Sequence, residues 1–261
     1  MLTPRHAFIA VLFIGLLACG AAQADPTLAM TIKPEAPLKA GVATPMTLVL
    51  THLPSGRPVH WRELRVVHTQ RLHLLVVDPT LTDYQHIHPI PGHPGHWSFT
   101  FTPKKEGSYR IWADVTPAAT GKQEYVKADV GTPIAPAPPM DKTTNHTTTV
   151  EGYTFDLAFD GPLRSGEAVM GKVRVADRDG HPVTMLEPVM GAFAHIVGFS
   201  EDGESVVHVH PMGPEPQHDS ARGGPELQFH FEPEKSGFTK LFVQVKLDNK
   251  DVFAPFGVEV R

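Results

Sequence analysis

The segment that decides the fold reads LHLLVVDPTLTDYQHIHP over residues 72–89, and its pattern returns as AHIVGFSEDGESVVHVHP over residues 194–211. In each copy, a short apolar run carries one histidine, and a His-x-His-Pro motif begins 13 residues after that histidine. Short runs rich in β-branched residues and bounded by Asp, Pro and Gly predict β-strands. A duplicated pattern of this length predicts two domains with the same fold.

The repeat continues on both sides of these segments. FTFTP at residues 99–103 matches FHFEP at 229–233, and GRPV at 56–59 matches GHPV at 180–183. The offset between the copies is 122 residues at the histidines and 130 residues after them. The difference predicts an eight-residue insertion in the Gly/Pro-rich loop 212–225 of the second copy.

The strand pattern predicts an all-β chain. Each copy holds about seven strand-like segments in about 110 residues, as in antiparallel β-sandwiches, and no segment shows a sustained 3.6-residue apolar period. We therefore expect two tandem antiparallel β-sandwich domains of immunoglobulin or cupredoxin type, at residues 25–131 and 150–261. The Pro/Thr-rich stretch 132–149 between them predicts an extended, semi-rigid linker.

Residues 1–24 predict an export leader and a periplasmic protein. Ala7–Ala18 is an apolar run too short for a stable membrane span, and Ala22-Gln-Ala24 fits cleavage by a signal peptidase. The alternative is a lipid anchor on Cys19, which follows Leu16-Leu-Ala in a lipoprotein-like box. Cys19 is the only cysteine, so cleavage after Ala24 leaves no disulfide, no thiol chemistry and no blue-copper site.

The composition and the motifs exclude several function classes. The net charge of −5 comes with no basic stripe, which argues against nucleic acid as a partner. No apolar run after the leader is long enough to cross a membrane. No nucleophile elbow, zinc-protease motif, phosphate-binding loop or dinucleotide fingerprint occurs, so we do not expect an enzyme. The 16 histidines are the outlying feature.

The spacing of the histidines predicts a metal site in each copy. Residues i and i+2 of a strand point to the same face, so the two histidines of each His-x-His motif project together. A further position lies five residues before the strand histidine, where the first copy has histidine and the second has methionine. The predicted ligands are His68, His73, His86 and His88 in the first copy and Met190, His195, His208 and His210 in the second.

These ligand types favour copper, with zinc as the alternative. Imidazole suits copper(II), zinc and nickel, and a thioether such as that of Met190 shifts the preference toward copper(I). Asp114 and Gln244, which occupy equivalent positions in the two copies, are candidate acceptors that orient the imidazoles or else ordinary surface residues. The competing interpretation is that the histidines are structural and bond to the backbone.

The two histidine-bearing segments, 72–89 and 186–211, resemble the exported bacterial β-sandwich proteins associated with heavy-metal and copper handling, in the neighbourhood of YtkA-like domains. This resemblance implies an envelope location, a cupredoxin- or immunoglobulin-like fold and a metal-related role. We therefore expect copper buffering or delivery, with an envelope cuproprotein or an efflux component as the partner. The alternatives are a non-catalytic accessory module of an envelope assembly and, third, a mononuclear copper enzyme.

Overall fold

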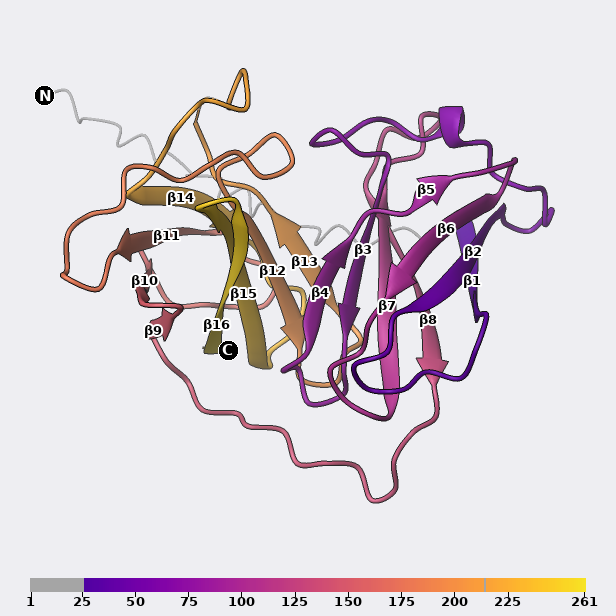
Figure 1. The fold of residues 1–261 in the computed structure, drawn as a ribbon, viewed down its shortest axis with the longest axis horizontal. Coiled ribbons are helices and arrows are strands. Elements are labelled where there is room, and N and C mark those ends of the chain that lie inside the picture. The colour runs from indigo at the N-terminus through magenta and orange to yellow at the C-terminus, as the bar shows by residue number, and fades with distance from the viewer. Residues whose placement is uncertain (1–25, 214) are drawn as a thin grey trace, which may run out of the picture.

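The computed structural model describes residues 26–213 and 215–261, and the fold is all-β as the strand pattern predicts (Figure 1). Two β-sandwich domains follow one another along the chain, each built from two four-stranded antiparallel sheets. The predicted leader and Cys19 lie outside the described residues. Within these ranges, no helix has the length and apolar character needed to cross a membrane.

The first domain contains one sheet with the strand order β1-β2-β6-β5 and one with the order β4-β3-β7-β8. A single turn of 3-10 helix, Trp61–Glu63, connects the two sheets after β2. The strands are β1 (Leu28–Pro34), β2 (Thr44–His52), β3 (Leu72–Val77), β4 (Tyr84–Ile87), β5 (Ile90–Pro91), β6 (His96–Phe101), β7 (Ser108–Val115) and β8 (Glu124–Gly131).

The second domain repeats this arrangement, with sheets ordered β14-β11-β10-β9 and β13-β12-β15-β16. The connection between β13 and β14 spans residues 210–225, against 88–95 between β4 and β6, so the insertion falls where the repeat offset predicts it. The strands are β9 (Thr147–Val150), β10 (Tyr153–Phe159), β11 (Val169–Ala176), β12 (His195–Ser200), β13 (Val206–Val209), β14 (Glu226–Phe231), β15 (Gly237–Leu247) and β16 (Lys250–Val260).

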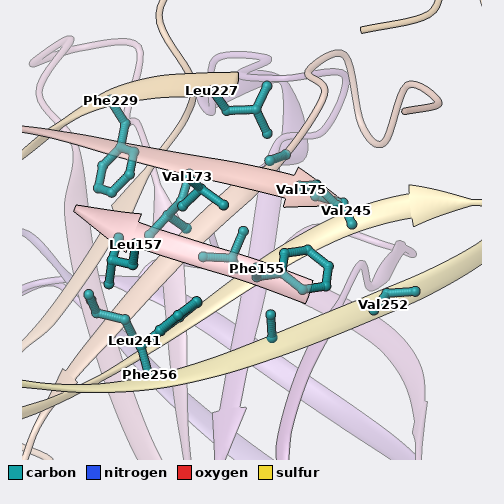
Figure 2. Close-up of a cluster of buried hydrophobic side chains, with 14 of the residues drawn as sticks. Phe155, Leu157, Val173, Val175, Leu227, Phe229, Leu241, Val245, Val252 and Phe256 are labelled. Carbon is teal, nitrogen blue, oxygen red and sulfur yellow. The ribbon is translucent and has the colours of Figure 1, made fainter. Parts of the chain in front are cut away.

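Each sandwich has its own core, and Figure 2 shows that of the second domain. Phe155 of β10, Phe229 of β14 and Phe256 of β16 are fully buried there, and Leu157 and Val173 pack among them. Burying a side chain of this size stabilises the fold by about 1.5–3 kcal/mol. Each core packs between the two sheets of its own domain and thereby fixes the positions of the histidine-bearing strands.

A third apolar cluster joins the two domains. Its members are Leu75, Val77, Leu81, Tyr84, Trp112, Val197, Phe199, Val206 and Phe242. The sheets that contain β3 and β12 therefore pack face to face, as Figure 1 shows at the centre of the molecule. This packing explains why all six residues of β3 are buried, since alternate residues serve the domain core and the interface.

The linker between the domains is exposed, as predicted, but it is shorter than the predicted 132–149, because Thr147–Val150 form β9, which pairs with β10 of the second domain. Residues 131–139 are all exposed, and Figure 1 shows this segment passing outside both sandwiches. We expect limited proteolysis to cut the linker and to leave two folded fragments that co-elute on gel filtration, because the third apolar cluster holds them together.

The matched control for this prediction is Phe199→Arg, which places a charge in the interface. The cut variant should elute as two separate fragments. Separation of the cut wild-type fragments, or loss of both halves after one cut, would contradict the prediction.

Candidate metal centre

The histidines gather at the interface because of the two-residue period of the strands. His73, Leu75 and Val77 lie on one face of β3, and the latter two belong to the interdomain cluster. His86 on β4 pairs in register with Leu75, so its side chain shares that face. The second domain repeats this placement, with His208 on β13 opposite Val197 on β12. Both histidine sets therefore point into the space between the domains.

In the first domain, three imidazoles converge. The Nδ1 atom of His73 lies 3.1 Å from Nε2 of His86 and 3.1 Å from Nε2 of His88. One nitrogen from each of the three rings lies within 4.8 Å of the others, which is close enough for one metal ion to bind all three. The structure thus brings together three of the four ligands that the sequence assigns to the first copy.

The second set is completed across the interface. Nδ1 of His195 lies 3.1 Å from Nε2 of His208, and one nitrogen of His86 from the first domain lies within 4.8 Å of a nitrogen of each. The ring centroid of His86 is 5.1 Å from that of His208 and 5.3 Å from that of His195. The first trio comes from the first copy alone, whereas the second is completed by His86 of the first domain, so the histidines of both domains form one cluster.

The structure also corrects the grouping of His68. Its ring stacks on that of His210 in the second domain, with centroids 3.5 Å apart, although the sequence assigns it to the first copy. His68 lies in the loop before β3, and this loop meets its counterpart before β12, where a Cβ on Gly191 would come within 3.2 Å of Thr69. His68 and its counterpart Met190 both have positive φ, 45° and 52°.

Hydrogen bonding fixes which nitrogen of each ring carries its proton. Nε2 of His73 donates to the carbonyl of Val67, 3.1 Å away, so in the neutral ring Nδ1 holds a lone pair. Nδ1 of His86 donates to Oε1 of Gln244, 3.0 Å away, so Nε2 of His86 holds a lone pair. These two lone pairs face each other at 3.1 Å. A cation between them, either a proton or a metal ion, removes the repulsion.

The second domain has the same arrangement. Nε2 of His195 donates to the carbonyl of Val189, 3.0 Å away, and Nδ1 of His208 donates to Oδ2 of Asp114, 2.7 Å away. The remaining lone pairs of His195 and His208 face each other at 3.1 Å. The backbone bonds expected of structural histidines are thus present at two rings, but they turn the free nitrogen of each ring toward the cluster.

Burial favours the neutral form of His73, His86, His88 and His195, which is the form that binds metals. Burial, with help from neighbouring histidines, lowers the pKa of His73 and of His88 to about 4. The same two causes hold the pKa values of His86 and His195 well below the usual range. A metal ion is therefore the cation that suits the facing lone pairs near neutral pH, because a proton is disfavoured there.

One further nitrogen points to a missing partner. Nε2 of His210 is buried and has no hydrogen-bond partner among the residues that the structure describes. A buried polar atom without a partner costs about 1–3 kcal/mol. The ring of His210 lies 4.5 Å from that of His195 and 4.6 Å from that of His208, centroid to centroid, so it borders the second set. These imidazole donors fit copper, zinc or nickel.

Two other groups of candidate ligands lie outside the cluster. His93 and His96 stack on each other with centroids 3.8 Å apart, in the loop before and at the start of β6. Asp177, Asp179 and His181 could also converge on an ion, but Oδ1 of Asp177 accepts hydrogen bonds from the backbone N–H groups of the other two. This second group is thus an ordinary turn at the surface.

Comparison with known proteins gives a family but no function. No curated protein matches the chain. Among solved structures, the chain is similar to Escherichia coli alpha-2-macroglobulin activated by porcine elastase, with 14% identity and a TM-score of 0.26, over 90% of this chain and 20% of that one. The family described as "Domain of unknown function (DUF8832)" matches residues 22–132 and again residues 148–261. The chain therefore belongs to the DUF8832 family and carries two copies of its domain.

Proposed function

We propose that this protein binds copper between its two domains and buffers or delivers it in the bacterial envelope. The observation that carries the proposal is the pair of facing lone pairs, one at His73 and His86 and one at His195 and His208. Each pair leaves two neutral imidazole nitrogens 3.1 Å apart, an arrangement that a bound cation stabilises. Two trios of histidines would hold the metal. The first is His73, His86 and His88. The second is His86, His195 and His208, with His210 and His68 beside it.

The ligand types favour copper over zinc. The trios contain imidazoles only, and divalent copper binds such nitrogen donors more tightly than zinc does. Met190 stands where the other copy has His68, and a thioether is a ligand for copper(I). The predicted leader and the resemblance to exported copper-associated proteins support an envelope location. A role in buffering or delivery needs no catalytic group, and it fits a cluster without a carboxylate ligand in either trio.

The test is to titrate the full chain with copper(II), anaerobically with copper(I), and with zinc, and to measure the metal that remains after gel filtration. We expect stoichiometric copper that zinc does not displace. The matched control is the double variant His93→Ala/His96→Ala, which removes two histidines outside the cluster and should retain the same copper. If the chain retains zinc alone in the presence of copper, the metal that the protein binds is zinc and not copper. Retention of neither metal would overturn the proposal.

A further inference from the structure

Two hydrogen bonds cross the interface and connect the histidine cluster to the opposite domain. His208 of the second domain donates to Asp114 of the first, and His86 of the first donates to Gln244 of the second. Asp114 lies on β7 and Gln244 lies on β15, at equivalent positions of the repeat, and both are buried. The two contacts are therefore equivalent in the repeat, but one acceptor is a carboxylate and the other is an amide.

A residue at or just before the start of the neighbouring strand contacts each acceptor, Gln123 beside Asp114 and Asp251 beside Gln244. The Gln123 amide donates to both oxygens of Asp114, at 2.9 Å each, which leaves the carboxylate as the acceptor for His208. In the second domain, Oε1 of Gln244 accepts from Nδ1 of His86, and the Gln244 side chain acts on the carboxyl of Asp251, whose pKa it lowers against the larger effect of burial. Gln123 and Asp251 occupy equivalent positions, each two residues before the strand partner of Asp114 or Gln244. The acid and the amide have thus exchanged places between the copies.

This exchange brings a carboxylate into direct contact with a cluster imidazole in only one half, because the acid of the other half, Asp251, acts on Gln244 rather than on a histidine. Asp114 is 6% exposed, and the groups that bond to its carboxylate are the Gln123 amide and the His208 ring. A buried carboxylate without a positive partner is costly, so it favours a cation on the other nitrogen of His208. A further carboxylate, that of Glu215, also lies on this side, 4.0 Å from His68.

The charge of the acceptor changes what the imidazole binds best. A carboxylate that accepts from a metal-ligating imidazole makes the ring a stronger donor, and its negative charge offsets more of the charge of a divalent ion than of a monovalent one. An amide orients the ring in the same way but adds no charge. The half that contains His208 therefore differs from the half that contains His73 and His88 in charge, although the imidazole geometry repeats.

Building on the proposed function, we propose that Asp114 is a positioning residue that makes the two halves of the cluster unequal. Acting through His208 of the other domain, it gives the second half the higher affinity for copper(II). Gln244, acting through His86, adds no charge at the imidazole and leaves the first half selective for copper(I). The domain that carries the acid thereby sets the metal preference of its neighbour.

The test compares the wild-type full chain with Asp114→Asn, which keeps the shape and removes the charge, and with Gln244→Glu, which adds a charge at the mirror position. Copper(II) affinity is measured by chelator competition, and copper(I) affinity by anaerobic competition with bathocuproine disulfonate. We expect Asp114→Asn to weaken the first equivalent of copper(II) by about 10–100-fold and copper(I) by less than about threefold. Gln244→Glu should strengthen the second equivalent of copper(II).

The ratio of the two affinities separates a charge effect from damage to the fold, because a misfolded variant loses both oxidation states equally. Equal losses, or no change in either variant while the wild type binds copper, would overturn the role of Asp114 and leave the proposed function standing. A wild-type chain that binds neither oxidation state would overturn both. A changed electron paramagnetic resonance spectrum of Asp114→Asn at one equivalent of copper(II) is the expected spectroscopic sign.

Discussion

Replacing His86 with alanine should weaken copper binding by the whole cluster by about 100-fold or more. His86 is the residue that belongs to both trios, and its one free nitrogen, Nε2, can bind an ion of either half but only one ion at a time. Loss of the groups that merely orient metal ligands already costs about 10–100-fold in affinity, and removal of a ligand should cost at least as much. Chelator competition on the full chain measures the effect for copper(I) and copper(II).

The matched control is His96→Ala, since His96 stacks on His93 outside the cluster. This variant should bind copper as the wild type does. A second comparison is His88→Ala, which belongs to one trio and should weaken one equivalent more than the other. If His86→Ala retains both equivalents with unchanged affinity and only melts at a lower temperature, the cluster is structural and the proposed function is wrong.

The metal-free protein should lose stability steeply as the pH falls from about 6.5 toward 4. An unfolded histidine has a pKa near 6.5, whereas burial lowers the pKa of the folded His73 to about 4. Between these values the unfolded chain takes up a proton that the folded chain does not, so acid favours unfolding. Stability is therefore complete above pH 6.5 and declines through this window. For His73, which is 3% exposed, the loss amounts to about 3 kcal/mol.

Urea unfolding of the metal-free chain at intervals from pH 7.5 to 4.5 measures this loss, and this range avoids most carboxyl titration. The His73→Gln variant should show a shallower dependence, because one of the buried histidines no longer titrates. His93→Ala, which removes an exposed histidine, should follow the wild type. A metal-free stability that stays constant from pH 7.5 to 5 would show that the folded imidazoles accept protons freely, contrary to their burial.

Much of the fold follows from the sequence. The duplicated segments, the even spacing of short strands and the shift in offset from 122 to 130 predict two like β-sandwiches and the place of the insertion. The i, i+2 rule also predicts which histidines share a face, because strand geometry is local and repeats every two residues. The continuous apolar run from Leu74 to Val77 indicates a strand buried on both sides.

The sequence by itself determined the residue types, their spacing within each copy and the equivalence of Asp114 with Gln244. Only the tertiary structure decided that both histidine sets face one another, that His68 stacks on His210, and that each acceptor serves the opposite domain. The physical reason is that strand periodicity specifies the direction of a side chain relative to its own sheet. The packing of one sheet on another depends on apolar surfaces such as those of Leu75 and Phe199, whose partners lie more than a hundred residues away.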